Sequence, residues 1–290
     1  MKIHLLPVPE RLRPSTQPFR YPRHNQDYGV EQDFYDYLVA NRPLLTDDPR
    51  EADWHYLPVF WTRWHLNHDY GKHGQEELQQ AVTGILQDDA KTFTICQYDD
   101  GPMADLGRTV QFLASRKTGQ GRDIPLLASP HRRPFWTPSK RYLASFVGRI
   151  STHPIRPRMA DALNGRRDVL IYDGDRGPGF FVRKTLGSYL ALAPRGYGGS
   201  SFRFFEALQL GVVPVLIGDL DTRPLKRSID WDSCSFYVSD PGKLPSLIDS
   251  LDRERLVAMG QHGAEVYRER LAFGKWCRFV LDELEKDHMS

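Results

Sequence analysis

The sequence of 290 residues has few cysteines, no long apolar run and almost no excess of charge of either sign. Its three cysteines, Cys96, Cys234 and Cys277, lie far apart, and no CxxC pair occurs. This spacing excludes a disulfide framework and a zinc site built from cysteines, and it fits a reducing compartment. No stretch of roughly 18 apolar residues is present, so the sequence predicts no helix that spans a membrane.

The charge balance argues against a nucleic-acid binder. Lys plus Arg number 39 and Asp plus Glu number 37, which gives 39 − 37 = +2 with His neutral. Proteins that bind nucleic acid usually carry a strong basic excess. The first residues, MKIHLLP, are broken too early by proline to form a secretory signal and instead predict a β-strand. We therefore expect a cytoplasmic location.

What the sequence does contain is an alternation of apolar strands with helical periods. The expected strands cover 54–60, 92–96, 109–114, 124–128, 142–147, 168–172, 189–193 and 212–217. The expected helices cover 28–39, 75–87, 179–187, 201–210, 242–251, 253–270 and 275–286, with another beginning near Pro154. Such alternation is typical of α/β proteins, in which helices cover both faces of a parallel sheet.

A basic, proline-rich segment divides this pattern. Residues 129–141 (SPHRRPFWTPSKR) hold three prolines and no hydrophobic period, which is typical of a linker or a solvated surface loop. The simplest architecture is two Rossmann-like parallel-sheet domains, 1–135 and 136–290. We expect the last helix to pack back on the first domain.

The most informative stretch runs from Ala191 to Asp219. A buried strand leads into glycines at 196, 198 and 199, then into Ser200 and Ser201 at the start of a helix. Glycines allow close approach of a ligand to the backbone, and serine caps a helix. The free N–H groups and positive dipole end of a helix N-terminus form a ready site for phosphate.

Two charged residues share one face of that helix. At 100° per residue, Phe204, Phe205 and Leu208 face the sheet, while Arg203 and Glu206 lie together on the opposite face. Taken alone, the pair is explained slightly better as an ordinary exposed ion pair. The neighbouring glycine loop favours a nucleotide site instead, with Arg203 on phosphate and Glu206 on ribose hydroxyls.

This stretch resembles the exostosin family of glycosyltransferases (glycosyltransferase family 47), and the resemblance covers roughly 28–240. The family pattern stands here as Pro194-Arg195-Gly196, Ser201-Phe202-Arg203, Glu206-Ala207 and Gly211 to Val215. Upstream segments that are similar are Tyr28-Gly29 with Glu31 and Phe34, Asp48 to Asp53, Tyr98 to Gly101, Asp123 to Pro125, and Phe146 to Arg149. The departures are Ala191 for a cysteine, Tyr98 for a histidine, and Arg223-Pro224-Leu225 for Leu-Pro-Phe.

The resemblance implies a GT-B fold, in which two Rossmann-like domains face a cleft. The donor, a nucleoside-diphosphate sugar, would occupy 136–290 and the saccharide acceptor 1–135, with inversion at the anomeric carbon and no metal or other cofactor. Polysaccharide or glycan synthesis would be the setting. The residues implied for the donor are Arg149, Arg195, Gly196, Gly198, Ser200, Ser201, Arg203 and Glu206. Arg203 would also be catalytic, because without a metal the departing diphosphate needs fixed positive charge.

Inversion also needs a base, and alternatives to this assignment exist. Asp99, at the end of a strand, is the first candidate, ahead of Asp100 and His65; each is also explained as a turn residue. Asp173 and Asp175 could hold a divalent metal in a metal-dependent glycosyltransferase, although an Asp-Gly turn explains them better. The residues His65, His68, Asp69 and His73 are best explained as a solvated loop. A carbohydrate-binding or scaffold subunit without catalysis is the remaining alternative.

Overall fold

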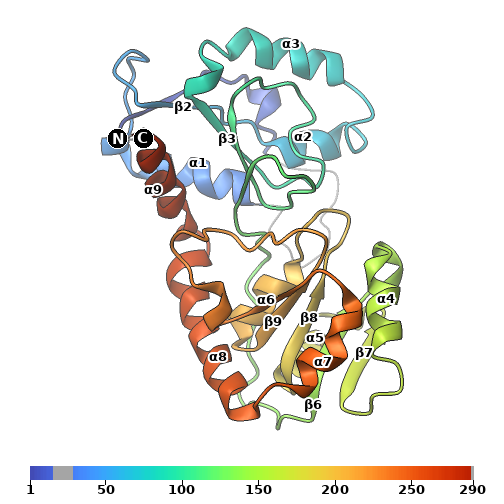
Figure 1. Ribbon diagram of the computed structural model, residues 1–290. Coiled ribbons are helices and arrows are strands. Elements are labelled where there is room, and N and C mark those ends of the chain that lie inside the picture. Colours follow the sequence, from blue (N-terminus) through green and yellow to red (C-terminus); the bar gives the residue numbers. More distant parts are fainter. Residues whose placement is uncertain (16–28, 289–290) are drawn as a thin grey trace. The chain divides into compact units, whose positions relative to one another are not determined.

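The computed structural model describes residues 1–15 and 29–288 (Figure 1). Tyr28, at the start of the expected first helix, lies outside the described residues. The chain divides into unit 1, Met1–Ile124 with Phe273–Ser290, and unit 2, Pro125–Ala272. Each unit contains one parallel five-stranded sheet. The expected α/β class with two parallel-sheet units is therefore confirmed. No helix in the described part of the chain has the length and apolarity that a membrane span requires.

Unit 1 has its strands in sequence order. The sheet runs β1 (Ile3–Leu5), β2 (Trp54–Tyr56), β3 (Thr92–Cys96), β4 (Val110–Leu113) and β5 (Arg122–Asp123). Its helices are α1 (Val30–Ala40), α2 (Trp61–Asn67), α3 (Gln75–Ile85) and α9 (Trp276–His288). The last helix is tied to α1, because Asp33 Oδ2 accepts the Gly274 N–H at 2.8 Å and the Trp276 Nε1–H at 2.7 Å. These bonds hold α9 within unit 1.

Unit 2 has helices on both faces of its sheet. The strands are β6 (Tyr142–Gly148), β7 (Val169–Asp173), β8 (Ser188–Pro194), β9 (Val213–Ile217) and β10 (Phe236–Val238). The helices are α4 (Ile155–Ala162), α5 (Pro178–Leu186), α6 (Phe202–Leu210), α7 (Leu244–Asp249) and α8 (Arg253–Val266), which continues as a π-helical turn, Tyr267–Leu271.

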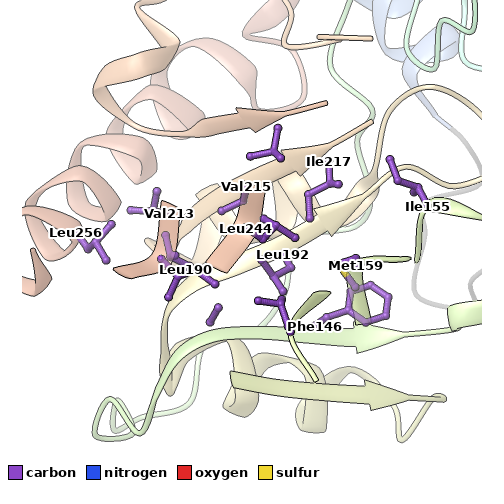
Figure 2. Close-up of a cluster of buried hydrophobic side chains, with 14 of the residues drawn as sticks. Phe146, Ile155, Met159, Leu190, Leu192, Val213, Val215, Ile217, Leu244 and Leu256 are labelled. Carbon is purple, nitrogen blue, oxygen red and sulfur yellow. The ribbon is translucent and has the colours of Figure 1, made fainter. Parts of the chain in front are cut away.

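Alternate residues of each strand in unit 2 point to opposite faces, as the period of two requires. Phe146, Leu190 and Leu192 enter the core that α4, α7 and α8 cover (Figure 2). Val147 and Ala191, the next residues along, enter the second core under α5 and α6. Helices therefore exclude water from both faces of this sheet, which explains why the sequences of its strands are continuous apolar runs.

The boundary between the units differs from the expected one at 135/136. It lies at Ile124/Pro125, and the C-terminal 18 residues of the sequence belong to unit 1. The segment expected to be a linker instead lies against α6, where the His131 N–H donates to Gln209 Oε1 at 3.1 Å and Arg133 donates to the Leu210 carbonyl. A carbonyl in the last turn of a helix has no partner within the helix, so an arginine there is stabilising.

A few short elements also differ from the expected pattern. The expected strand 124–128 is absent, and β5 ends at Asp123, just before Pro125. The expected strand 54–60 ends at Tyr56, and α2 begins at Trp61. The strand β10, with three residues, had no distinct period to predict it.

Candidate functional site

The strand order of unit 2 reverses beside β6. Read from one edge, the sheet runs β7-β6-β8-β9-β10, which is the order 2-1-3-4-5 within the unit. The helix after β6, α4, covers one face, whereas the helix after β8, α6, covers the other. In open parallel sheets, ligands bind outside the carboxyl ends of the strands at such a switch point. The residues that follow β6 and β8 are therefore the candidate site.

Arg156 ties these two strand ends together. From the first turn of α4, its Nη1 donates to the Arg149 carbonyl at 2.7 Å, its Nε to the Arg195 carbonyl at 3.0 Å and its Nη2 to the Pro194 carbonyl at 3.3 Å. One guanidinium thus satisfies carbonyls at the ends of both β6 and β8. Sequence reasoning missed Arg156, because nothing in the sequence places 156 beside 194. Arg149 itself, which follows β6 directly, is exposed.

The buried side chain of Arg195 stabilises the glycine-rich loop, residues 196–199. Its side chain is buried, its Nε donates to the Gly198 carbonyl at 3.0 Å, and its Nη1 pairs with the carboxylate of Asp219. Its backbone N–H continues the ladder to Ile217 at 2.8 Å. The loop then closes on itself, since the Gly196 N–H donates to the Ser200 carbonyl at 3.3 Å. The guanidinium of Arg195 is thus committed to the shape of the loop.

The N-terminus of α6 lies where this loop ends. Ser200 and Ser201 are both buried, and Ser201 is the N-cap residue with φ −144°. Its hydroxyl makes no capping bond, and within 1–15 and 29–288 it has no hydrogen-bond partner at all. A buried hydroxyl without a partner costs free energy unless a ligand satisfies it. Together with the unpaired N–H groups of a first helical turn, it suits an anion.

Arg203 and Glu206 do lie side by side, as their helical spacing predicted. Arg203 Nη1 donates to Glu206 Oε2 at 2.5 Å, and its Nε donates to the Val147 carbonyl, next to the end of β6, at 3.1 Å. The guanidinium carbon lies 4.2 Å from the centre of the Phe181 ring. Arg203 is about a quarter exposed, with a relative accessibility of 26%. These contacts hold a cation at the same strand ends as the loop.

Glu206 is buried, so the alternative of an ordinary exposed ion pair does not describe it. Its side chain is only 4% exposed, and Oε1 lies 2.8 Å from Nε2 of His131. The ring of His131 packs on Phe181, which is therefore shared by His131 and Arg203. The segment at 131 covers this side of α6, and that contact joins residues 75 positions apart. Sequence reasoning missed His131 because it lay in the expected linker.

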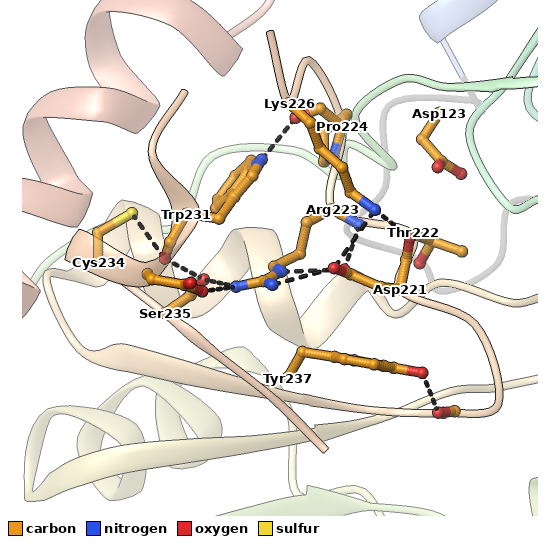
Figure 3. A network of polar contacts seen from close by, with 12 residues as sticks. Asp123, Asp221, Thr222, Arg223, Pro224, Lys226, Trp231, Cys234, Ser235 and Tyr237 are labelled. Carbon is orange, nitrogen blue, oxygen red and sulfur yellow. Dashed lines mark hydrogen bonds and ion pairs between the residues drawn. The ribbon is translucent and has the colours of Figure 1, made fainter. Parts of the chain in front are cut away.

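The loop after β9 lies against the glycine-rich loop. The Thr222 hydroxyl donates to the Gly199 carbonyl at 3.3 Å. Arg223 is nearly buried, and its guanidinium contacts both Asp221 and Asp232 at 2.9 Å (Figure 3). Burial alone would raise the pKa of Asp221, but the hydrogen bonds and charge of Arg223 outweigh burial and lower it. The departure Arg223-Pro224-Leu225 thus contributes an ion-pair network that fixes this loop.

The candidate bases lie in unit 1, in and around the turn after β3. Asp99 is half-buried, whereas Asp100 is exposed and paired with Lys117. His65 is fully buried, which corrects the expectation of a solvated loop, and its Nε2 lies 2.9 Å from the Pro102 carbonyl. Burial lowers the pKa of His65 to about 4, so this ring is neutral at physiological pH. A neutral ring whose Nε2–H is committed keeps only Nδ1 as an acceptor.

The carboxylates of Asp173 and Asp175 each accept a hydrogen bond from a backbone N–H. Asp173 Oδ1 accepts the Ile150 N–H at 2.8 Å, and Asp175 Oδ1 accepts the Gly177 N–H at 2.7 Å. In the described part of the chain, no three His, Cys, Asp or Glu side chains gather closely enough to hold a metal ion. A bend at Gly174 follows β7, and Asp173 joins the end of β7 to the residues that follow β6.

Unit 1 contains a further buried carboxylate, Glu31, close to the turn that follows β3. Glu31 Oε1 accepts the Gln97 N–H at 2.9 Å and the Thr62 hydroxyl at 2.8 Å, and both of its oxygens lie 3.1 Å from the Thr62 nitrogen. Burial raises the pKa of Glu31 to about 7 despite these donors. Glu31 thus joins the start of α2 to the residue that follows β3.

Comparison with known proteins gives one family. Residues 119–251 match the domain described as "Exostosin GT47 domain". Exostosin-1 of Drosophila melanogaster is 30% identical over 172 residues, which cover 51% of this chain and 22% of that protein. The Exostosin-1 homolog of Caenorhabditis elegans is 38% identical over 82 residues, covering 28% of this chain and 22% of that protein. The chain thus matches about a fifth of the length of each of these relatives.

Two solved structures align with this chain at low sequence identity. AviGT4, a glycosyltransferase involved in avilamycin A biosynthesis, aligns with a TM-score of 0.42 and 13% identity, over 100% of this chain and 98% of its own. TarM aligns with a TM-score of 0.40 and 9% identity, over 73% and 58%. The sequence matches carry the likeness: residues 119–251 match the exostosin GT47 domain, and the chain is similar to the exostosin-1 proteins over part of its length.

Proposed function

We propose that the chain transfers a sugar from a nucleoside-diphosphate sugar to a saccharide acceptor, and that the diphosphate binds at the N-terminus of α6. One observation carries this proposal. The buried, unpartnered hydroxyl of Ser201 lies at a helix N-terminus, at the switch point of the sheet. Arg203, held beside the end of β6, supplies positive charge there, and Arg149 follows that strand directly.

In the proposed reaction, the acceptor hydroxyl oxygen attacks the anomeric carbon and inverts it. The bond from that carbon to the diphosphate oxygen breaks, and the diphosphate leaves with the bonding electrons. A base, for which Asp99 is our candidate, takes the hydroxyl proton. Arg203 and the N–H groups of α6 would stabilise the charge that grows on the leaving group, and such fixed donors need no reorganisation during the reaction.

The remaining donor residues have distinct proposed roles. Arg195 and Arg156 shape the loop and the strand ends, which leaves the backbone at Gly196 and Gly198 to approach the diphosphate. Glu206 would keep its ion pair with Arg203 through Oε2 and would accept a hydrogen bond from a ribose hydroxyl at Oε1. Oε1 also lies 2.8 Å from His131 Nε2, so the ribose hydroxyl would either share this oxygen with the imidazole or replace it there.

Kinetics of Arg203 variants test the proposal. Arg203→Ala should lower kcat by on the order of 10²-fold, whereas loss of a merely structural contact would leave kcat near that of the wild type. Arg203→Lys should recover part of the loss, since it restores the charge without the planar fork. Excess chelator should leave transfer unchanged. Abolition of transfer by chelator with rescue by Mn²⁺ would instead favour Asp173 and Asp175.

The role of Glu206 is tested by ligands that differ only in the nucleoside part. Glu206→Gln should weaken binding of a nucleoside diphosphate more than it weakens binding of inorganic pyrophosphate. The wild type should bind a 2′-deoxynucleoside diphosphate more weakly than the ribose form. If the substitution changes both ligands equally, Glu206 acts only through Arg203 and the ribose lies elsewhere.

A further inference from the structure

The amino end of the unit 2 sheet carries a basic and aromatic surface that the proposed reaction does not use. Parallel strands place their amino ends opposite the carboxyl ends, so this surface lies away from the candidate site. We term residues 131–141 the basic–aromatic segment, and the surface is formed by the part of it that follows His131. The segment enters β6 at Tyr142.

Both ends of the basic–aromatic segment are fixed to unit 2. At its start, the His131 N–H bonds Gln209 Oε1 at 3.1 Å and Arg133 bonds the Leu210 carbonyl. At its end, Lys140 Nζ donates to the Ser188 carbonyl at 2.6 Å. Pro134 and Pro138 restrict the backbone between these anchors. The residues between the two anchored ends are therefore held in place on the surface of unit 2.

The middle of the segment exposes two adjacent aromatic rings. Phe135 has a relative accessibility of 106% and Trp136 one of 66%. Scattered apolar residues on a surface are ordinary, but two neighbouring large rings on one projecting loop are not. Trp in particular is enriched at the interface between water and lipid, where its ring is apolar and its N–H is solvated.

Basic residues flank these rings in the sequence. The segment contains Arg132, Arg133, Lys140 and Arg141 and no acidic residue. Behind it lies a pocket of about 410 Å³ whose charged lining residues are Arg133, Lys140, Arg268 and Glu265, three cations and one carboxylate. The pocket floor is apolar, with Leu186, Leu210 and Leu256.

The cations of this pocket are crowded. Burial, and then the nearby charge of Arg133, lower the pKa of Lys140 to about 8. A bound anion would oppose both effects, since an opposite charge favours the charged form of a lysine. Anionic lipid headgroups attract exposed basic residues in the same way.

We propose that the basic–aromatic segment docks unit 2 on an anionic phospholipid surface, with Phe135 and Trp136 entering the interface and a headgroup phosphate lying among Arg133, Lys140 and Arg268. The combination of exposed rings with flanking cations is that of interfacial membrane anchors. The inference does not depend on which sugar is transferred.

Vesicle sedimentation tests the proposal. The wild type should sediment with phosphatidylcholine vesicles that contain 30% phosphatidylglycerol at least tenfold more tightly than with pure phosphatidylcholine. The double substitution Phe135→Ser/Trp136→Ser and, separately, Arg132→Gln/Arg141→Gln should each weaken this binding about tenfold or more. None of these four side chains is an anchor of the segment, so circular dichroism and thermal unfolding should match the wild type. Tyr70→Ser is the matched control in unit 1, where Tyr70 is 50% exposed, and it should bind like the wild type.

Fluorescence locates the contact. Trp136→Phe should retain vesicle binding but lose the blue shift of tryptophan emission that the wild type shows on anionic vesicles. Equal binding to both kinds of vesicle, or wild-type binding by either double variant, would overturn the proposal. A concentration-dependent dimer that Phe135→Ser/Trp136→Ser abolishes, with no binding to vesicles, would overturn it too and identify a contact between copies of the chain.

Discussion

Glu206 should be important for the stability of unit 2 as well as for the proposed donor site. Its carboxylate is 4% exposed and lies between Arg203 Nη1 at 2.5 Å and His131 Nε2 at 2.8 Å. Glu206→Ala removes both contacts at once. A hydrogen bond to a charged group contributes about 1.5–3 kcal/mol, and breaking a buried ion pair by removing one partner costs about 3–5 kcal/mol.

Part of this cost should be offset, because Arg203 keeps the Val147 carbonyl and the face of Phe181. We therefore expect the free energy of unfolding to fall by about 3 kcal/mol, a value at the lower end of that range. For a unit of this size, such a loss lowers Tm by roughly 6–12 °C. Glu206→Gln, which retains an acceptor for one partner, should cost less.

Urea unfolding followed by far-ultraviolet circular dichroism measures this effect as a change in the transition midpoint. Glu254→Ala is the control, because that carboxylate is exposed on α8, and it should leave the midpoint unchanged. A Glu206→Ala variant as stable as the wild type would refute the reasoning. It would mean that Glu206 stands in solvent and that His131 does not cover it.

Two further predictions concern unit 1 and the packing of unit 2. Burial raises the pKa of Glu31 from 4.5 to about 7, so the folded state holds a proton that the unfolded state loses. The free energy of unfolding should therefore fall by about 3 kcal/mol in total as the pH rises from 4.5 through 7. Urea titrations of Glu31→Gln at each pH should give a flatter profile, and a profile equal to that of the wild type would contradict the assignment. Gly260→Ala should destabilise by about 1–3 kcal/mol, because its Cβ would lie 2.4 Å from the Gly211 carbonyl oxygen. Gly84→Ala, in an open position of α3, should instead stabilise by about 0.5 kcal/mol. Thermal unfolding distinguishes the two glycines, and equal effects would contradict the packing described.

The parts of the fold that follow from local pattern could be predicted from the sequence. Strand β3 has the expected bounds, and α5 and α6 differ from the expected ones by one residue at most. The order of the strands could not be predicted, because hydrophobic period carries no information about which strands pair. The switch point beside β6, which locates the site, therefore emerged only from the structure.

The candidate site shows the same division. Helical spacing correctly placed Arg203 beside Glu206, since both lie on one short helix. It could not show that His131, 75 residues away, covers Glu206, nor that Arg156 spans the ends of two strands. Such contacts depend on tertiary packing between distant segments. The basic and proline-rich composition of 129–141 predicted an exposed segment. Phe135 is exposed as predicted, but the start of the segment is hydrogen-bonded to α6, which the composition did not predict.

The binding of nucleoside diphosphates to the folded protein tests the proposed donor site most directly. Calorimetric titration of a panel of nucleoside diphosphates should find at least one that the wild type binds, and Arg203→Ala should weaken that binding by at least tenfold. Arg158→Ala is the matched control, because Arg158 is an exposed arginine of α4 paired with Asp240, and it should bind like the wild type. If Arg203→Ala and the wild type bind the same nucleotide equally well, the diphosphate does not lie at the N-terminus of α6 and the account of the site is wrong.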